Sequence, residues 1–287
     1  MARAMSTSEA SAYRVRGPSA VTGDPRRLLA LSVTLAVTDW KLRFFGSVLG
    51  YVWSLLRPLL LFGILYVVFS EVVGVNAGIA DYPLLLISGI VLFFTFGEMT
   101  GGAVTSMVDR ESLVRKVGFP RMAVPLSVVI AATFNLGLNL VTVAIFVAAS
   151  GASPRWSWLL LPIPLVLLLV LGAGLAMLLS AMYVPFRDVR PIWDIVQQAL
   201  FYATPILYPI EKVAERSDTL AKVVMCNPLA VTIQEFRHLL LGPSVPSAAK
   251  AIGGVEWLLV PGGILLGLTG LGFLVFNRMA PHAAERL

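Results

Sequence analysis

Six apolar segments restrict this chain to an all-α polytopic membrane protein. A helix needs about 20 mainly apolar residues to cross a bilayer. The predicted spans cover about residues 48–72, 84–107, 122–149, 157–184, 192–209 and 256–277. Hydrophobic residues make up 57% of the chain and charged residues only 13%. A soluble domain contains about 25% charged residues, so the composition agrees with the spans.

The first span is interrupted at its centre by Arg57 and Pro58. The apolar stretch before them has 13 residues and the one after has 12, so neither could cross the membrane alone. The segment is therefore either one span with a charge inside it or no span. We favour one span, in which Arg57 lies about 13 Å from the cytoplasmic start. There the side chain could extend to the interface, pair with Glu98 of the second span, or face a channel.

The distribution of basic residues predicts the orientation of the chain. Seven Lys or Arg residues precede residue 44, and four lie in the segment 108–121. The loops after the first and third spans hold none and one. Because short cytoplasmic loops carry the excess of Lys and Arg, both termini are predicted to be cytoplasmic. We expect a flexible cytoplasmic tail at 1–24 and a cytoplasmic tail at 279–287, on either side of a single transmembrane domain at 25–278.

Two segments are too short to span but are amphipathic. Residues 25–43 predict a helix that lies in the membrane interface. Its predicted interfacial residues are Arg26, Arg27, Trp40, Lys41 and Arg43. Residues 210–242 predict two short helices around the turn Asn227–Pro228. They fit a re-entrant or surface hairpin between the fifth and sixth spans, because irregular backbone at membrane depth must be covered by protein or water.

Aromatic residues are concentrated in the first and fifth spans. Phe62, Tyr66 and Phe69 share one helical face, and Phe201 and Tyr202 precede a break at Pro205. Such a stripe is more often a lipid anchor or part of a core than a binding surface. Aromatic faces also suit sugar rings, so a role in a glycan channel is the alternative.

Several functions are disfavoured by what the sequence lacks. A Gly-Lys pair, which a Walker A motif requires, does not occur, so no ATP site of that type is expected. Cys226 is the single cysteine and the two histidines are far apart, so neither a disulfide nor a metal site is expected. One Glu and one Arg within the spans are too few for a proton relay. Scattered basic residues do not indicate nucleic-acid binding.

Three segments together resemble a known family. They are "RFFGSVLGYVWSLLRPLL" at 43–60, "ESLVRKVGFPRMAVPL" at 111–126, and "FRDVRPIWDIVQQALFYATPILYPIEKV" at 186–213 followed by "NPLAVTIQEFRHLLLG" at 227–242. In this order they resemble the membrane subunit of type-2 ABC exporters for polysaccharides, in the O-antigen, teichoic-acid and lipid-linked galactan branch. Arg57 departs from the pattern, since this position is often Asn or Glu in the family.

The resemblance implies a homodimer in the plasma (inner) membrane that pairs with two copies of a separate ABC ATPase. ATP and Mg would be bound by that partner subunit, and this chain would hold no cofactor and would not be an enzyme by itself. The substrate would be a glycan linked to polyprenyl diphosphate, exported from the cytoplasm through a channel at the dimer centre. A coupling helix at about 109–119 would dock on the ATPase, and the hairpin at about 210–242 would act as an extracytoplasmic gate.

The same resemblance assigns residues to each part. The predicted channel residues are Trp53, Arg57, Phe62, Tyr66, Phe69, Phe201, Tyr202 and Tyr208. The predicted coupling residues are Asp109, Arg110, Glu111, Leu113, Val114, Arg115, Lys116, Val117 and Phe119, with Asp109 as the helix N-cap. The predicted gate residues are Asn227, Pro228, Glu235 and Arg237.

Two other functions remain as alternatives. One is a type-2 ABC permease for a drug or a lipid, against which the aromatic stripes weigh. The other is a membrane glycosyltransferase or lipid-diphosphate enzyme, which would need clustered acids or histidines at one membrane face, and the sequence shows none.

Overall fold

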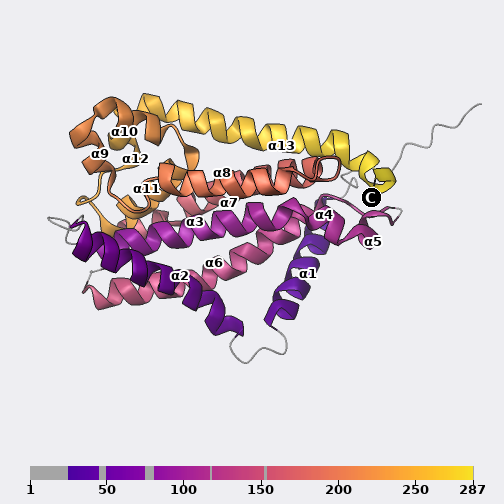
Figure 1. The fold of residues 1–287 in the computed structure, drawn as a ribbon, viewed down its shortest axis with the longest axis horizontal. Helices are drawn as coiled ribbons and strands as arrows, with labels where there is room; N and C mark the ends of the chain where they lie inside the picture. Colours follow the sequence, from indigo (N-terminus) through magenta and orange to yellow (C-terminus); the bar gives the residue numbers. More distant parts are fainter. Residues whose placement is uncertain (1–24, 45–49, 75–80, 117, 152–153, 287) are drawn as a thin grey trace, which may run out of the picture.

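The computed structural model describes residues 25–44, 50–74, 81–116, 118–151 and 154–286. Within these residues every regular element is a helix and no strand is formed (Figure 1). In chain order the helices are α1 (Pro25–Phe44), α2 (Gly50–Val67), η1 (Val68–Val72), α3 (Tyr82–Val104), α4 (Ser106–Asp109), α5 (Glu111–Val114), α6 (Ala123–Ala149), η2 (Trp156–Leu160), α7 (Pro162–Tyr183), α8 (Val189–Ala203), α9 (Ile210–Arg216), α10 (Asp218–Met225), α11 (Pro228–Leu241), α12 (Ala248–Ile252), η3 (Val255–Leu258) and α13 (Leu259–Arg286). The predicted tail 1–24 and Val117 lie outside the described residues.

Five helical segments of the described chain are long and apolar enough to cross a membrane. They are Val52–Val72, Tyr82–Val104, Ala123–Ala149, Trp156–Tyr183 and Val255–Ala280. The first is a continuous helix through Arg57 and Pro58, so the interruption in the sequence does not divide it. The fifth predicted span, 192–209, is not among these helical segments. Its helix α8 has 15 residues, or about 22 Å of length, and ends at Ala203.

α3 is the central helix of the bundle. It contacts α2, α6, α7, α8 and α11, and it lies between them in Figure 1. Its most apolar window is 83% buried, compared with 6% for the Val52–Val72 segment and 17% for Val255–Ala280. The sequence does not distinguish these spans, because all of them have a high mean hydropathy. The exposed spans are the ones left to face lipid or another subunit.

Small residues allow two of these helices to pack closely. A Cβ atom on Gly272 of α13 would collide with the carbonyl of Gly174 on α7, and one on Gly174 would collide with Thr269. Close backbone approach of this kind is a common mode of helix association in lipid. Gly263 and Gly267 lie on the same helix, but no described neighbour comes within 4 Å of the position that a Cβ atom would take on either of them.

The segment after α8 leaves the helix and exposes backbone carbonyls inside the protein. Thr204 is extended, and Pro205 cannot donate a hydrogen bond. The fully buried side chain of Arg237 on α11 fills this gap. Its NH2 group donates to the carbonyls of Ile206 at 2.9 Å and Leu85 at 2.7 Å, and its NH1 group donates to that of Pro205. The absence of a side chain on Gly89 leaves space for this guanidinium.

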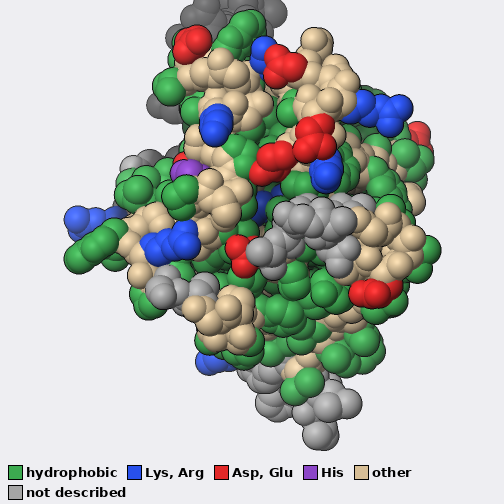
Figure 2. Space-filling view, turned by 90° about the vertical axis from the view of Figure 1, so that its left-hand side faces the viewer, with side chains coloured by type: hydrophobic (Ala, Val, Ile, Leu, Met, Phe, Trp, Pro, Cys, Tyr) green, Lys and Arg blue, Asp and Glu red, His purple; other side chains and the backbone are tan. Residues whose placement is uncertain are grey.

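The region after α8 contains more helices than the two short ones that the sequence predicts. α9 and α10 are followed by a turn at Asn227, where the Asn227 side chain caps α11 by accepting from the Leu229 N–H at 3.0 Å. α11 is mostly buried because it covers α3 and α7. Figure 2 looks onto this end of the bundle and shows acidic and basic side chains in its upper part, above an apolar surface. We call α9–α12 the hairpin region.

Replacing Arg237 with Ala should destabilise the protein by about 3 kcal/mol or more. The change leaves the buried carbonyls of Leu85, Pro205 and Ile206 without their donor, and each unsatisfied buried group costs about 1–3 kcal/mol. Thermal unfolding of the detergent-solubilised chain measures this loss. Arg216→Ala, at an exposed position in the same region, is the control and should leave the midpoint unchanged. An Arg237→Ala variant as stable as the wild type would contradict the proposed contribution.

Candidate translocation groove and coupling surface

A polar groove of about 490 Å³ lies between α2, α3 and α8. α2 contributes Arg57, and α3 contributes Glu98 together with the rings of Phe93 and Phe94. Its full set of lining residues is Arg57, Leu61, Phe93, Phe94, Gly97, Glu98, Gly101, Gly102, Arg190, Asp194, Gln197, Gln198, Phe201 and Tyr202. Cations, carboxylates, amides and aromatic rings therefore line one cavity in an otherwise apolar helix bundle.

α8 is held against α3 by polar contacts to backbone. Gln197 Nε2 donates to the Gly97 carbonyl at 3.2 Å and to Thr100 Oγ1 at 3.1 Å. Arg190 NH1 donates to the Gly101 carbonyl at 3.0 Å, and Arg190 also pairs with Asp194 at 3.3 Å. A Cβ atom at Gly97 would lie only 3.2 Å from Gln197 Nε2, so the small residues of α3 bring α8 close.

Arg57 and Glu98 both line the groove but do not pair with each other among the described residues. The Arg57 guanidinium lies over the Phe94 ring, 5.4 Å from its centroid, and the side chain is exposed. The Glu98 carboxylate instead accepts from Asn135 Nδ2 at 3.0 Å and lies 3.7 Å from Arg43 NH1. Arg57 therefore lines the groove without the predicted partner Glu98. Whether its side chain extends to the interface or faces a channel stays a prediction.

The predicted channel residues divide into two groups. Arg57, Phe201 and Tyr202 line the groove, with the Phe201 ring 5.2 Å from that of Phe93. Phe62 and Tyr66 instead pack against Phe146 and Tyr82, at centroid distances of 5.0 and 6.3 Å.

The remaining three channel residues lie away from the groove lining. Phe69 packs against the main hydrophobic core, and the Tyr208 hydroxyl donates to the Tyr202 carbonyl at 3.2 Å. Trp53 is 61% exposed on α2. Whether any of these side chains meets a substrate stays a prediction.

Helix α1 connects the groove to the coupling segment. The Trp40 indole donates to Asn135 Oδ1 at 3.0 Å, and Asn135 in turn contacts the groove residue Glu98. On the same helix, Asp39 forms an ion pair with Arg110, whose NH1 donates to Ser127 Oγ at 2.6 Å. Burial lowers the pKa of the Arg110 guanidinium, which nevertheless stays charged, as Arg does in proteins. We call this set the α1 network.

The sequence predicts only some of the contacts of the α1 network. Trp40 was predicted to lie at headgroup level, and the structure gives it a hydrogen-bond partner on α6 as well as an edge contact with the Phe134 ring. Arg43 reaches Glu98, while Lys41 is exposed. Arg26 and Arg27 lie in the first turn of α1 and are exposed. Interfacial placement of this helix stays a prediction.

The coupling segment is two single turns of helix, α4 and α5, where the sequence predicts one short helix at about 109–119. Asp109 ends α4, and its carboxylate accepts from Thr105 Oγ1 at 2.7 Å, so it does not cap the following turn. Val114 is fully buried in a small core with Met107 and Phe276, and Phe119 packs on this core. Arg115 and Lys116 are exposed, as are Asp109 and Ser112. Arg115 pairs with Glu111 at 2.7 Å, beside the half-buried Leu113.

Arg121 holds the coupling segment to the C-terminal helix. Its side chain is 5% exposed and donates to the carbonyls of Val114 at 3.3 Å and Ala280 at 2.8 Å. Sequence reasoning counted Arg121 only as a positive charge, because a basic loop residue gives no sign of burial. Figure 1 shows the coupling segment, the end of α13 and the chain terminus at the same end of the bundle, opposite the hairpin region.

The predicted gate residues all make contacts that organise the hairpin region. Asn227 Nδ2 donates to Thr204 Oγ1 at 3.1 Å, next to the break after α8. Pro228 occupies the first turn of α11, and Glu235 Oε2 accepts from the Ala248 N–H at 2.9 Å. Arg237 binds the carbonyls described above. These contacts fix the fold of the region and leave its movement as a prediction.

The described residues contain no group of three or more His, Cys, Asp or Glu side chains that could hold a metal ion. The groove instead offers guanidinium groups, which bind phosphate, and amides, which both donate and accept hydrogen bonds to hydroxyl groups. The carboxylates of Glu98 and Asp194 balance the two guanidinium groups in number, and Arg190 already pairs with Asp194. The lining therefore suits a polar ligand, with Arg57 as the cation for an anionic group.

Comparisons with known proteins identify the family of the chain. Residues 31–241 match the family model described as ABC-2 type transporter. The chain is 29% identical over 262 residues to the O-antigen export system permease protein RfbA of Klebsiella pneumoniae, which covers 91% of this chain and 96% of the relative. It is 28% identical over 218 residues to the protein of the same name from Myxococcus xanthus, which covers 76% and 83%. The family match includes every helix of the groove and the coupling segment, and the chain is therefore a multi-pass membrane protein that belongs to the ABC-2 type transporter family.

Proposed function

We propose that this chain is the channel-forming membrane subunit of an ATP-driven exporter for a polysaccharide linked to polyprenyl diphosphate. The glycan would be of O-antigen, galactan or teichoic-acid type, and it would leave the cytoplasm across the inner membrane. The observation that carries this proposal is the groove between α2, α3 and α8. Its guanidinium groups fit a diphosphate, and its amides and aromatic rings fit sugars. The names of the relatives support the same substrate class.

Energy for transport would come from a separate ABC ATPase, which binds ATP and Mg. The chain has no Walker A motif of its own, and family membership supports a partner of this kind. The ATPase would dock at the coupling segment, where Arg115 and Lys116 are exposed. ATP binding would move this segment as a rigid body, and the α1 network would carry the movement toward Glu98 in the groove.

A homodimer would close the groove on its open side. The neighbouring faces of α2 and α8 carry exposed apolar side chains, among them Ile64 at 62% and Ile195 at 69%. These faces would lie against the second copy or against lipid. Both termini and the coupling segment would be cytoplasmic. α8 with the turns after it would make one further crossing, the fifth in chain order. The hairpin region would lie at the extracytoplasmic end.

The overall proposal is tested by co-purification and depletion. The chain, produced together with a candidate ABC ATPase from the same genome, should co-purify with that ATPase in equal amounts. Depletion of the chain in cells should cause a lipid-linked glycan to accumulate at the cytoplasmic face of the membrane, and mass spectrometry of the lipid extract identifies that glycan. Complementation with the wild-type chain is the control. Normal glycan export after depletion would reject the function.

Charge reversal at the coupling surface should separate the chain from its ATPase. Arg115→Glu together with Lys116→Glu should reduce co-purification of the ATPase and abolish export, because both side chains are exposed at the proposed docking site. The matched control is Lys212→Glu with Arg216→Glu, which reverses two exposed charges at the opposite end of the bundle. If the coupling variant exports normally, the docking assignment is wrong.

Breaking the ion pair of the α1 network should uncouple ATP hydrolysis from export. Asp39→Asn removes the charge that faces Arg110 but leaves the exposed docking residues intact. We expect the ATPase still to bind and hydrolyse ATP while export falls, and the charge swap Asp39→Arg with Arg110→Asp should partly restore export. Asp218→Asn breaks an exposed pair with Lys222 and serves as the control. Equal loss of ATPase binding and export would instead indicate a purely structural role.

Neutralising Arg57 should impair export without affecting assembly. Arg57→Gln removes the positive charge from the groove and keeps a polar, though shorter, side chain. A loss of about tenfold or more in export would indicate contact with an anionic group, because one charge-assisted hydrogen bond contributes about 1.5–3 kcal/mol. Arg187→Gln is the matched control, because Arg187 also lies over an aromatic ring, Tyr183, but does not line the groove. Normal export by Arg57→Gln would exclude substrate recognition by this side chain.

A further inference from the structure

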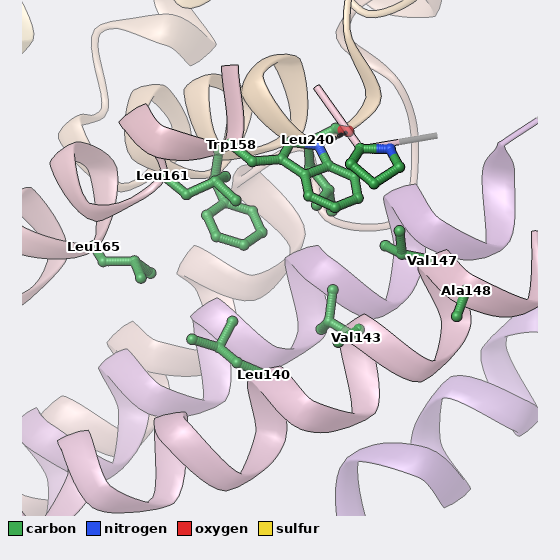
Figure 3. Close-up of a pocket in the computed structure, with 11 residues that line it drawn as sticks. Leu140, Val143, Val147, Ala148, Trp158, Leu161, Leu165 and Leu240 are labelled. Atoms are coloured by element: carbon green, nitrogen blue, oxygen red, sulfur yellow. Dashed lines mark hydrogen bonds between the residues drawn. The ribbon is translucent and has the colours of Figure 1, made fainter. Parts of the chain in front are cut away.

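A second cavity, separate from the groove, lies between α6, η2, α7 and α11. It has a volume of about 390 Å³, within the range of about 300–1,000 Å³ typical of ligand pockets. All eleven lining residues are hydrophobic. In Figure 3, Leu140, Val143 and Val147 of α6 lie opposite Trp158, Leu161 and Leu240. We call this cavity the apolar pocket.

The surface around the apolar pocket is suited to lipid. The pocket belongs to two of the candidate membrane spans, Ala123–Ala149 and Trp156–Tyr183. Beside it, the side chains of Ile145 on α6 and Ile163 on α7 are 62% and 55% exposed. An apolar cavity that opens on an apolar surface of a membrane span will exchange with hydrocarbon chains and not with water.

A cation stands at one edge of the apolar pocket. Arg155 directly follows the lining residue Pro154, is exposed, and donates through NH1 to the carbonyl of Leu241 at 2.5 Å. This bond fixes the guanidinium and leaves other N–H groups directed away from that carbonyl, and Arg binds phosphate through paired donors. The neighbouring Trp156 is 88% exposed, as expected for a residue at the level of lipid headgroups.

We propose that the apolar pocket binds one acyl chain of an anionic phospholipid, whose phosphate lies at Arg155. The pocket matches the acyl chain in polarity, and the guanidinium of Arg155 at its edge favours an anionic headgroup over a zwitterionic one. This inference does not depend on the substrate of the groove.

The bound lipid would stabilise the hairpin region. Phe236 and Leu240, which line the apolar pocket, belong to α11, and Arg237 between them holds the carbonyls after α8. The side of the pocket formed by η2 and α11 is held together by hydrogen bonds. Ser157 Oγ and Trp158 Nε1 donate to the carbonyls of Leu239 and Leu240 at 2.7 and 3.1 Å. These bonds satisfy carbonyl groups at the end of α11 that have no partner within the helix. The pocket is thus preformed, and filling it adds contacts to α11.

Photo-crosslinking of the purified full-length chain tests the site. The probe is phosphatidylglycerol with a photoactivatable diazirine near the end of one acyl chain, and mass spectrometry maps the labelled peptides. We expect saturable labelling of α6 and α11 residues that line the pocket, and weaker labelling by the phosphatidylcholine analogue. Labelling spread evenly over the exposed faces of α2 and α13 would overturn the proposal.

Two pairs of variants assign the parts of the site. Ala144→Phe fills the pocket and should weaken the specific labelling about tenfold, the effect expected when two buried methylene groups lose their contacts. Ala149→Phe, an exposed position on the same helix outside the lining, should not change it. Arg155→Gln should remove the preference for phosphatidylglycerol, and Arg216→Gln should preserve it. Unchanged labelling of correctly folded Ala144→Phe, or no preference for the anionic lipid in the wild type, would overturn the proposal.

Discussion

The buried guanidinium of Arg237 is the interaction on which the arrangement of this bundle depends. In a membrane protein every backbone polar group at membrane depth needs a partner, because lipid supplies none. α8 ends after 15 residues, and the turns that follow it include two prolines. Arg237 donates to the carbonyls of Pro205 and Ile206 in these turns and to that of Leu85 on the central helix α3. A single side chain thereby joins the end of α8, the hairpin region and the centre of the bundle.

Arg121 makes a similar junction at the opposite end. It is also buried, and it also donates to backbone carbonyls, here of Val114 in the coupling segment and Ala280 in α13. Each arginine donates to carbonyls of two chain segments that are distant in sequence from each other. Between these ends, the α1 network supplies a third polar path, from the coupling segment through Asp39 and Asn135 to Glu98 in the groove. The polar contacts therefore connect the proposed ATPase site with the proposed substrate path.

The sequence predicted the class of fold but not the roles of particular polar residues. Long apolar runs identify spans regardless of partners, so five of the six predicted spans correspond to long apolar helices. The sequence does not predict which spans are buried inside the bundle. The candidate spans of α3 and α13 have similar mean hydropathy, and only packing distinguishes them. The charge inside the first span pointed to Arg57, and the family resemblance pointed to Phe201 and Tyr202. The structure brings these residues together with Glu98 and Gln197 in one groove. The resemblance could not indicate that Arg121 is buried or that Val114 faces the interior, since both depend on contacts with α13, distant in sequence.

The proposed crossing at 192–209, the fifth in chain order, follows from the geometry of α8 and the segment after it. α8 alone is about 22 Å long, and the hydrocarbon core is about 30 Å thick. The six residues from Thr204 to Pro209 would need to supply about 8 Å more, well below the roughly 20 Å that a fully extended chain of that length can reach. Such irregular backbone is tolerated at membrane depth only when protein or water covers it. Arg237 and Asn227 provide that cover, since they bind Pro205, Ile206 and Thr204. A crossing made of a short helix and a protein-covered turn also places polar residues such as Gln197 beside a groove, which a uniformly apolar helix would not do.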